Sequence, residues 1–212
     1  MATITPQETD ILLVVDVQND FCPGGALEVP DGDAVVPVIN GLIDRFAHVA
    51  LTQDWHPPGH QSFASSHAGR QPFEMIEVAY GPQTLWPDHC VQGTPGAAFH
   101  ERLVTDRAEM IVRKGFRPEI DSYSAFYEND RKTATGLAGS LRERGFRRVF
   151  AAGLATDFCV KFTLVDAAAE RFEAFLIEDG SRAIDLDGSL AAAMDEMKAA
   201  GVSVIQSADV GG

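Results

Sequence analysis

Three residues of this 212-residue sequence have side chains that together could perform nucleophilic catalysis: the carboxylate of Asp16, the amine of Lys114 and the thiol of Cys159. A thiol attacks as its thiolate, and a nearby ammonium or the N-terminal turn of a helix favours that form. A neighbouring carboxylate can move protons to and from the reacting groups. Taken singly, each residue has an ordinary structural explanation: a cap, a surface charge or a core cysteine.

A second set of residues could hold a metal ion. Asp54 and His56 are separated by one residue, His89 follows later in the chain, and His60 and His67 lie between them. One carboxylate with two or three imidazoles suits zinc, manganese or iron(II). The same residue types also occur in loops where histidines only cap or hydrogen-bond, so the spacing leaves both explanations open.

The elements that must position these residues are predicted from apolar patterning. Six short apolar segments are typical of buried parallel strands. They are residues 11–17, 49–52, 110–113, 149–152, 174–177 and 202–205. Apolar residues at helical spacing lie between several of them, within 35–46, 137–141, 160–172 and 190–197. Strands that alternate with helices predict an α/β fold in which helices cover both faces of a parallel sheet.

The candidate residues share one position in this predicted fold. Asp16, Asp54 and Lys114 end or directly follow predicted strands, and the turn before Cys159 follows another. In parallel α/β sheets the functional site lies beyond the carboxyl ends of the strands. We therefore expect these residues, although far apart in the sequence, to form one site.

Cys159 lies within residues 153–160 (GLATDFCV), which we predict to be a turn into an alanine-rich helix. Thr156 or Asp157 is the expected N-cap. Cys159 then falls in the first helical turn, where unpaired N–H groups favour a thiolate and could also hold an oxyanion. Upstream, residues 60–94 show little periodicity, and such a long irregular stretch in a compact domain is usually functional.

The composition is that of a globular protein and disfavours two kinds of partner. Hydrophobic residues make up 45% of the chain and charged residues 23%, which are ordinary values for a globular protein. The length predicts one domain over residues 1–212. The net charge of −14 disfavours nucleic acid and anionic membrane surfaces as partners.

The cysteines and the N-terminus indicate a cytoplasmic protein. The three cysteines, Cys22, Cys90 and Cys159, form no even disulfide framework, which favours a reducing compartment. The apolar run of residues 11–15 is too short for a secretory leader or a membrane span.

Five motifs resemble the nicotinamidases of the isochorismatase-like hydrolase superfamily. They are DVQNDFCPGGAL at 16–27, DWHP at 54–57, WPDHCV at 86–91, KG at 114–115 and GLATDFCV at 153–160. The resemblance runs in the same order from about residue 11 to residue 205. It implies a three-layer α/β/α fold whose six-stranded parallel sheet has the strand order 3-2-1-4-5-6, so that Asp16 and Cys159 meet while Lys114 reaches in from farther away.

The resemblance also implies roles for individual residues. Asp16, Lys114 and Cys159 match the catalytic triad, with backbone N–H groups of Ala155 and Cys159 as oxyanion donors and a cis peptide before Ala155. One divalent ion per chain, zinc first and manganese or iron as alternatives, would be held by Asp54, His56 and His89. His60 matches a ligand found in some members only, and His67 has no assigned role. The residues that match the pocket around a flat ring are Phe21, Leu27, Trp86 and Tyr123.

The implied reaction is hydrolysis of nicotinamide to nicotinate and ammonia through a cysteine thioester, as in NAD salvage. Asp16 would protonate the leaving ammonia and then act as base for water, while Lys114 holds the charges and the metal binds the pyridine nitrogen. One alternative is a metal-independent amidase acting on an N-carbamoyl or ureido compound. Another is a non-catalytic metal-binding protein on this fold. A homo-oligomer and activity on pyrazinamide are left open.

Overall fold

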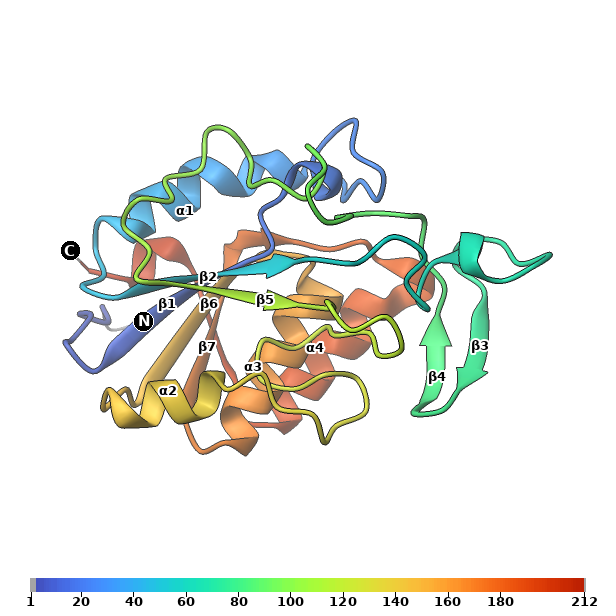
Figure 1. Ribbon diagram of the computed structural model, residues 1–212. Coiled ribbons are helices and arrows are strands. Elements are labelled where there is room, and N and C mark those ends of the chain that lie inside the picture. The colour runs from blue at the N-terminus through green and yellow to red at the C-terminus, as the bar shows by residue number, and fades with distance from the viewer. Residues whose placement is uncertain (1–2, 212) are drawn as a thin grey trace.

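The computed structural model describes residues 3–211 and has a central sheet of six parallel strands (Figure 1). The strands are β1 (Asp10–Val15), β2 (Val49–Asp54), β5 (Met110–Lys114), β6 (Arg148–Leu154), β7 (Glu173–Arg182) and β8 (Ser203–Ile205). Their order across the sheet is β5-β2-β1-β6-β7-β8. Counted along the chain, this is the predicted order 3-2-1-4-5-6.

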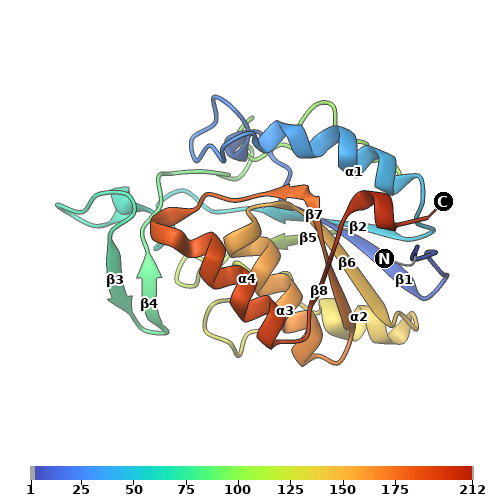
Figure 2. The same ribbon diagram turned by 180° about the vertical axis from the view of Figure 1, so that it is seen from behind.

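Helices cover both faces of this sheet, as predicted. They are α1 (Val35–Ile43), α2 (Leu137–Glu143), α3 (Lys161–Ala169) and α4 (Ser189–Ala199). Figures 1 and 2 show α1 on one face and the other three helices on the opposite face. Shorter helical turns span Asn19–Phe21, Gly32–Ala34, Ala64–Ser66, Thr156–Val160, Leu186–Gly188 and Ser207–Asp209. Within residues 3–211, no helix has the length and hydrophobicity needed to cross a membrane.

The central strand β1 explains why the sheet has two cores. Leu12 and Val14 pack into the cluster that contains the apolar residues of α1. Leu13 and Val15 point the other way, into the cluster that contains Leu164 of α3 and its neighbours. Successive side chains of a strand alternate between faces, so a strand covered on both faces must be apolar at every position.

A two-stranded hairpin lies within the irregular stretch and was not predicted. Strands β3 (Met75–Val78) and β4 (Gly81–Thr84) pair in antiparallel fashion. Figure 1 shows the hairpin beyond the carboxyl ends of β2 and β5. Gly81 and Pro82 are residue types that strands usually lack, and Met75 is exposed, so this segment has no clear strand signal.

Strand β7 is longer than the predicted 174–177 because its second half pairs with β6 after an irregularity in register. Ala151 pairs with Leu176, but Gly153 pairs with Ser181. Such a bulge bends and twists the strand locally. It lies directly before the turn that contains Cys159.

Candidate active site

The candidate residues lie together at the carboxyl ends of four adjacent strands. Asp16 directly follows β1, Asp54 ends β2 and Lys114 ends β5, where it is the register partner of Asp54. Cys159 lies in the turn after β6. Lys114 therefore reaches Asp16 past β2 and Cys159 past both β2 and β1, as the predicted strand order requires.

Lys114 is the centre of the buried charge cluster. Its Nζ lies 2.7 Å from Asp16 Oδ2 and 3.3 Å from Cys159 Sγ. It also donates hydrogen bonds to Asp54 Oδ1 and, at 3.1 Å, to the carbonyl oxygen of Ser122. The side chains of Lys114 and Asp16 are fully buried, and Cys159 is 6% exposed.

The two oxygens of Asp16 have different surroundings. Oδ1 accepts a 2.6 Å hydrogen bond from Thr52 Oγ1. Oδ2 forms the ion pair with Lys114 but accepts no well-aligned hydrogen bond from any residue within 3–211. One oxygen each of Asp16 and Asp54 and the sulfur of Cys159 lie within 4.8 Å of one another. The carboxyl group of Asp16 is thus close enough to exchange a proton with a group bound beside Cys159.

Burial and neighbouring charges shift the carboxyl pKa values in opposite directions. Burial raises the pKa of Asp16, an effect that Asp54 reinforces and Lys114 opposes. Burial also acts on Asp54, but Lys114 and His56 outweigh it and hold the pKa of Asp54 well below its usual range. Asp54 is therefore ionised, whereas Asp16 binds a proton more readily than an ordinary aspartate.

The surroundings of Cys159 favour the thiol, whereas its expected place in a helix would favour the thiolate. Burial raises the pKa of its thiol well above the usual range, and Lys114 only partly opposes this effect. Asp16 and Asp54 raise the pKa further because a thiolate beside two carboxylates is repelled. A neighbouring base that accepts the thiol proton would therefore help Cys159 to react as a nucleophile.

The nucleophile turn also differs from the expected helix start. Thr156–Val160 form a π-type turn after Ala155, and α3 begins only at Lys161. Neither predicted N-cap side chain caps this turn. Asp157 instead accepts hydrogen bonds from Ser189 Oγ and from the backbone N–H groups of the loop after β7, at 3.1 Å and 2.8 Å. The peptide between Leu154 and Ala155 is cis, as the resemblance implied.

Asp54, His56 and His89 form a buried cluster suited to a divalent cation. Asp54 Oδ2 lies 3.6 Å from His56 Nε2 and 3.7 Å from His89 Nε2. His56 Nδ1 lies 2.9 Å from the Gly115 carbonyl, and His89 Nδ1 lies 2.8 Å from that of Pro87. A carbonyl only accepts, so each Nδ1 carries a proton, and each Nε2, on the side facing Asp54, is the nitrogen that could bind a metal ion. These donors fit a metal ion.

His60 does not join this cluster. Its Nδ1 accepts a hydrogen bond from the Ser62 N–H at 3.2 Å, and its Nε2 lies 2.9 Å from the Arg117 carbonyl oxygen. Both ring nitrogens are thus engaged, and burial lowers the pKa of the ring. His60 therefore connects two loops rather than offering a lone pair to a metal. His67 contacts the Gln61 carbonyl, in keeping with its lack of an assigned role.

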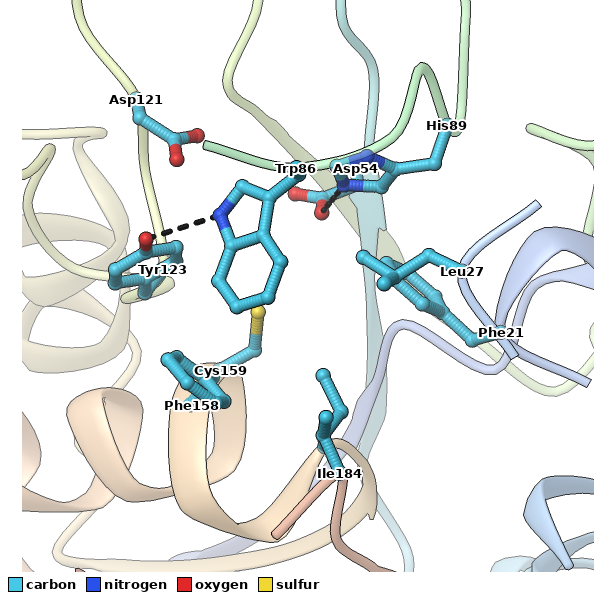
Figure 3. A pocket seen from close by; sticks show the side chains of 11 residues that line it. Phe21, Leu27, Asp54, Trp86, His89, Asp121, Tyr123, Phe158, Cys159 and Ile184 are labelled. Carbon is cyan, nitrogen blue, oxygen red and sulfur yellow. Dashed lines mark hydrogen bonds and ion pairs between the residues drawn. The ribbon is translucent and has the colours of Figure 1, made fainter. Parts of the chain in front are cut away.

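A pocket that is partly open to solvent connects the thiol with this cluster. Its lining residues are Phe21, Leu27, Asp54, Trp86, His89, Asp121, Tyr123, Ala155, Phe158, Cys159 and Ile184. Figure 3 shows Trp86, Phe158 and Tyr123 gathered around Cys159, with Asp54 and His89 at another side of the pocket. Trp86 Nε1 donates a 3.1 Å hydrogen bond to the Tyr123 hydroxyl. The aromatic walls suit a flat ring.

All four predicted pocket residues line this cavity, but three others were missed. Phe158 directly precedes Cys159, so its place in the nucleophile motif is a usable signal. Asp121 begins a loop that has no distinctive pattern. Ile184 lies in the loop after β7 and reaches the pocket only through tertiary packing.

Comparison with known proteins extends the likeness to almost the whole chain. The model of a family described as the isochorismatase domain matches residues 10–209. The nicotinamidase of Acinetobacter baylyi is 53% identical over 199 residues, which cover 94% of this chain and 93% of that protein.

Two solved structures are also similar. One, described as a nicotinamidase and pyrazinamidase of Acinetobacter baumanii, has a TM-score of 0.95 and 53% identity, and the match covers 96% of this chain and 98% of that one. A pyrazinamidase of Pyrococcus horikoshii, solved in complex with zinc, has a TM-score of 0.76 and 37% identity, and the match covers 93% and 99% of the two chains.

Proposed function

The chain belongs to the isochorismatase family, and we infer that it hydrolyses nicotinamide to nicotinate and ammonia. The observation that carries this function is one pocket bordered both by the thiol of Cys159 and by Asp54 and His89 of the candidate metal cluster. A planar substrate with an amide at one position and a ring nitrogen at another matches these two chemistries.

Cys159 is the proposed nucleophile and Asp16 its proton acceptor. The Cys159 proton moves to Asp16 as the sulfur attacks the carboxamide carbon and forms a C–S bond. Asp16 is suited to take this proton because burial raises its pKa. The resulting oxyanion would be held by the backbone N–H groups of Ala155 and Cys159. The Lys114 ammonium, 2.7 Å from Asp16 and 3.3 Å from the sulfur, limits the build-up of negative charge.

The same carboxyl group completes the reaction. Asp16 returns the proton to the amide nitrogen, the C–N bond breaks and ammonia leaves a thioester on Cys159. Asp16 then accepts a proton from water, whose oxygen attacks the thioester carbon. The C–S bond breaks, nicotinic acid leaves and loses its proton to solvent as nicotinate, and the proton on Asp16 restores the thiol. One carboxylate thus serves as base and acid in turn, which requires a pKa nearer to neutrality than that of a surface aspartate.

Asp54, His56 and His89 are the proposed ligands of one divalent ion. When bound, the ion supplies a Lewis-acid site for the pyridine nitrogen, which orients the carboxamide toward Cys159. Zinc is the proposed ion because one carboxylate and two imidazoles suit it and because the similar pyrazinamidase was solved with zinc. Manganese and iron are the alternatives that metal analysis would distinguish.

The alternative functions are less well supported. A metal-independent amidase would not need the buried Asp54, His56 and His89 cluster. A non-catalytic protein would not need Lys114 against both Asp16 and Cys159 in a buried site. A cytoplasmic location remains a prediction from the sequence.

Ammonia release from nicotinamide and from benzamide tests this function. Benzamide keeps the carboxamide but lacks the ring nitrogen, so it should be a poor substrate with or without metal. Chelation or His56→Ala should nearly eliminate nicotinamide hydrolysis. If benzamide were hydrolysed as well as nicotinamide and still required the ion, the metal would act on water or the carbonyl, and the orienting role would be wrong.

A further inference from the structure

The pocket contains a third buried carboxylate that the proposed reaction does not use. Asp121 is 2% exposed and lines the cavity beside Trp86 and Tyr123 (Figure 3). Its oxygens accept hydrogen bonds at 2.8 Å from the Ser122 N–H and from Gln83 Nε2. Both donors are neutral. No arginine, lysine or histidine within residues 3–211 forms an ion pair with Asp121.

The ammonium group inside the site is already paired with the other two carboxylates. Lys114 forms ion pairs with Asp16 and Asp54 but none with Asp121. Burial of a carboxylate that has no cationic partner is unfavourable even when it is hydrogen-bonded. The site thus holds three carboxyl groups, those of Asp16, Asp54 and Asp121, beside the one ammonium of Lys114, and a divalent ion would add positive charge to these acidic surroundings. This compensation rests on the proposed metal site.

Asp121 is placed to act on that ion without binding it directly. One of its oxygens lies within 4.8 Å of a ring nitrogen of His56 and of a ring nitrogen of His60. His56 also belongs to the cluster with Asp54 and His89, whereas Asp121 does not. A separate ion between Asp121, His56 and His60 is unsuitable because both nitrogens of His60 are engaged in hydrogen bonds.

We propose that Asp121 is an affinity determinant for the divalent ion: its buried negative charge, next to His56 but outside the three ligands, retains the cation in the pocket. Asp121 is also linked by hydrogen bonds to the aromatic residues of the pocket. Gln83 donates to Asp121 and also, at 3.1 Å, to the Tyr123 hydroxyl, which accepts from Trp86. Loss of the Asp121 charge should therefore weaken metal binding, and loss of its hydrogen bonds should loosen the contacts among Gln83, Tyr123 and Trp86.

Asp121→Asn tests this proposal because it removes the charge and keeps the shape. The zinc affinity of the whole protein is measured by competition with a chromophoric chelator. We expect it to fall by about 10- to 100-fold, the usual effect of altering a group that supports metal ligands. The matched control is Asp44→Asn, which removes the same charge from a side chain that is 79% exposed. That control should leave zinc affinity unchanged.

Thermal unfolding of the metal-free and zinc-loaded proteins separates this role from a purely structural one. Metal-free Asp121→Asn no longer buries an uncompensated charge, but its amide nitrogen cannot accept one of the two hydrogen bonds, so its own unfolding temperature is the baseline for the effect of zinc. Zinc should stabilise the variant less than it stabilises the wild type. An unchanged zinc affinity, or equal losses of stability with and without zinc, would overturn the proposal.

Zinc binding by the wild type and by His56→Ala shows whether a negative result contradicts the role of Asp121 or the metal site itself. If the wild type binds one zinc ion that His56→Ala loses, but Asp121→Asn binds it equally well, only the role of Asp121 is wrong. If the wild type binds no zinc, or His56→Ala binds it unchanged, the metal site itself is wrong and the role of Asp121 falls with it.

Discussion

The Lys114 ammonium lies 3.3 Å from the Cys159 sulfur, yet the pKa of that thiol stands well above its usual range. Burial disfavours the thiolate, and Asp16 and Asp54 add repulsion that one ammonium does not overcome. Lys114 therefore lowers the pKa of the Cys159 thiol only in part, and it does not by itself keep Cys159 as a thiolate. In the proposed reaction, activation of Cys159 therefore relies on proton transfer to Asp16.

Removal of Lys114 should make the thiol still harder to ionise. Thiolate reactivity rises as pH passes the thiol pKa, so Lys114→Met should shift alkylation of Cys159 to higher pH. Asp16→Asn removes a negative charge and should shift it to lower pH. The pH dependence of iodoacetamide labelling, followed at Cys159 by peptide mass spectrometry, measures both. Profiles that coincide with the wild type would show that neither charge acts on the thiol.

Cys159→Ala should lower kcat for nicotinamide by at least about 10³-fold, because no other group can form the thioester. Metal content and the folded state should stay unchanged. Cys22→Ala is the control: Cys22 is also buried, but it lies in the core beneath α1 and does not line the pocket. Substantial turnover by Cys159→Ala would rule out the covalent mechanism.

Asp16→Asn should slow both thioester formation and its hydrolysis by at least about 100-fold, since the amide cannot transfer the protons. Single-turnover and steady-state assays separate the two steps. Asp10→Asn is a matched control, because Asp10 is a buried aspartate at the opposite end of the same strand, paired with Arg148. It should lower the unfolding temperature without reducing kcat. An equal loss of kcat in both variants would assign Asp16 a structural role only.

Gly115→Ala should weaken metal binding by at least about tenfold through His56. A Cβ at this position would lie 2.4 Å from His56 Cε1, so the ring must move. Gly145→Ala provides the comparison, because Gly145 also has positive φ but a Cβ there would meet nothing within 4 Å. Both variants lose about 1–2 kcal/mol of stability from the left-handed backbone. Isothermal titration with zinc should reveal the affinity loss in Gly115→Ala alone.

His60→Gln should keep one metal ion per chain, whereas His89→Ala should lose it. His60 uses both ring nitrogens in hydrogen bonds, so its replacement should lower the unfolding temperature rather than the metal content. Elemental analysis of the purified variants gives the stoichiometry. Loss of the metal from His60→Gln at an unchanged unfolding temperature would make His60 a ligand after all.

The sequence by itself predicted the architecture of the central sheet and most of the residues that line the pocket. A strand buried on both faces, such as β1, must be apolar at every position, so its pattern is visible locally. The carboxyl ends of parallel strands share one edge of the sheet. Asp16, Asp54 and Lys114 could therefore be assigned to one place without coordinates, and the motif around Cys159 added the candidate nucleophile.

Only the tertiary structure decided how these groups behave. Whether Cys159 rests as a thiol depends on its burial and on charges from three other strands. Asp157 has the right residue type for an N-cap, but the loop after β7 supplies its hydrogen-bond donors. His60 is engaged by a loop nearly 60 residues away in sequence. The free energy of a polar side chain depends on which distant groups surround it, and neither spacing nor local propensity records that.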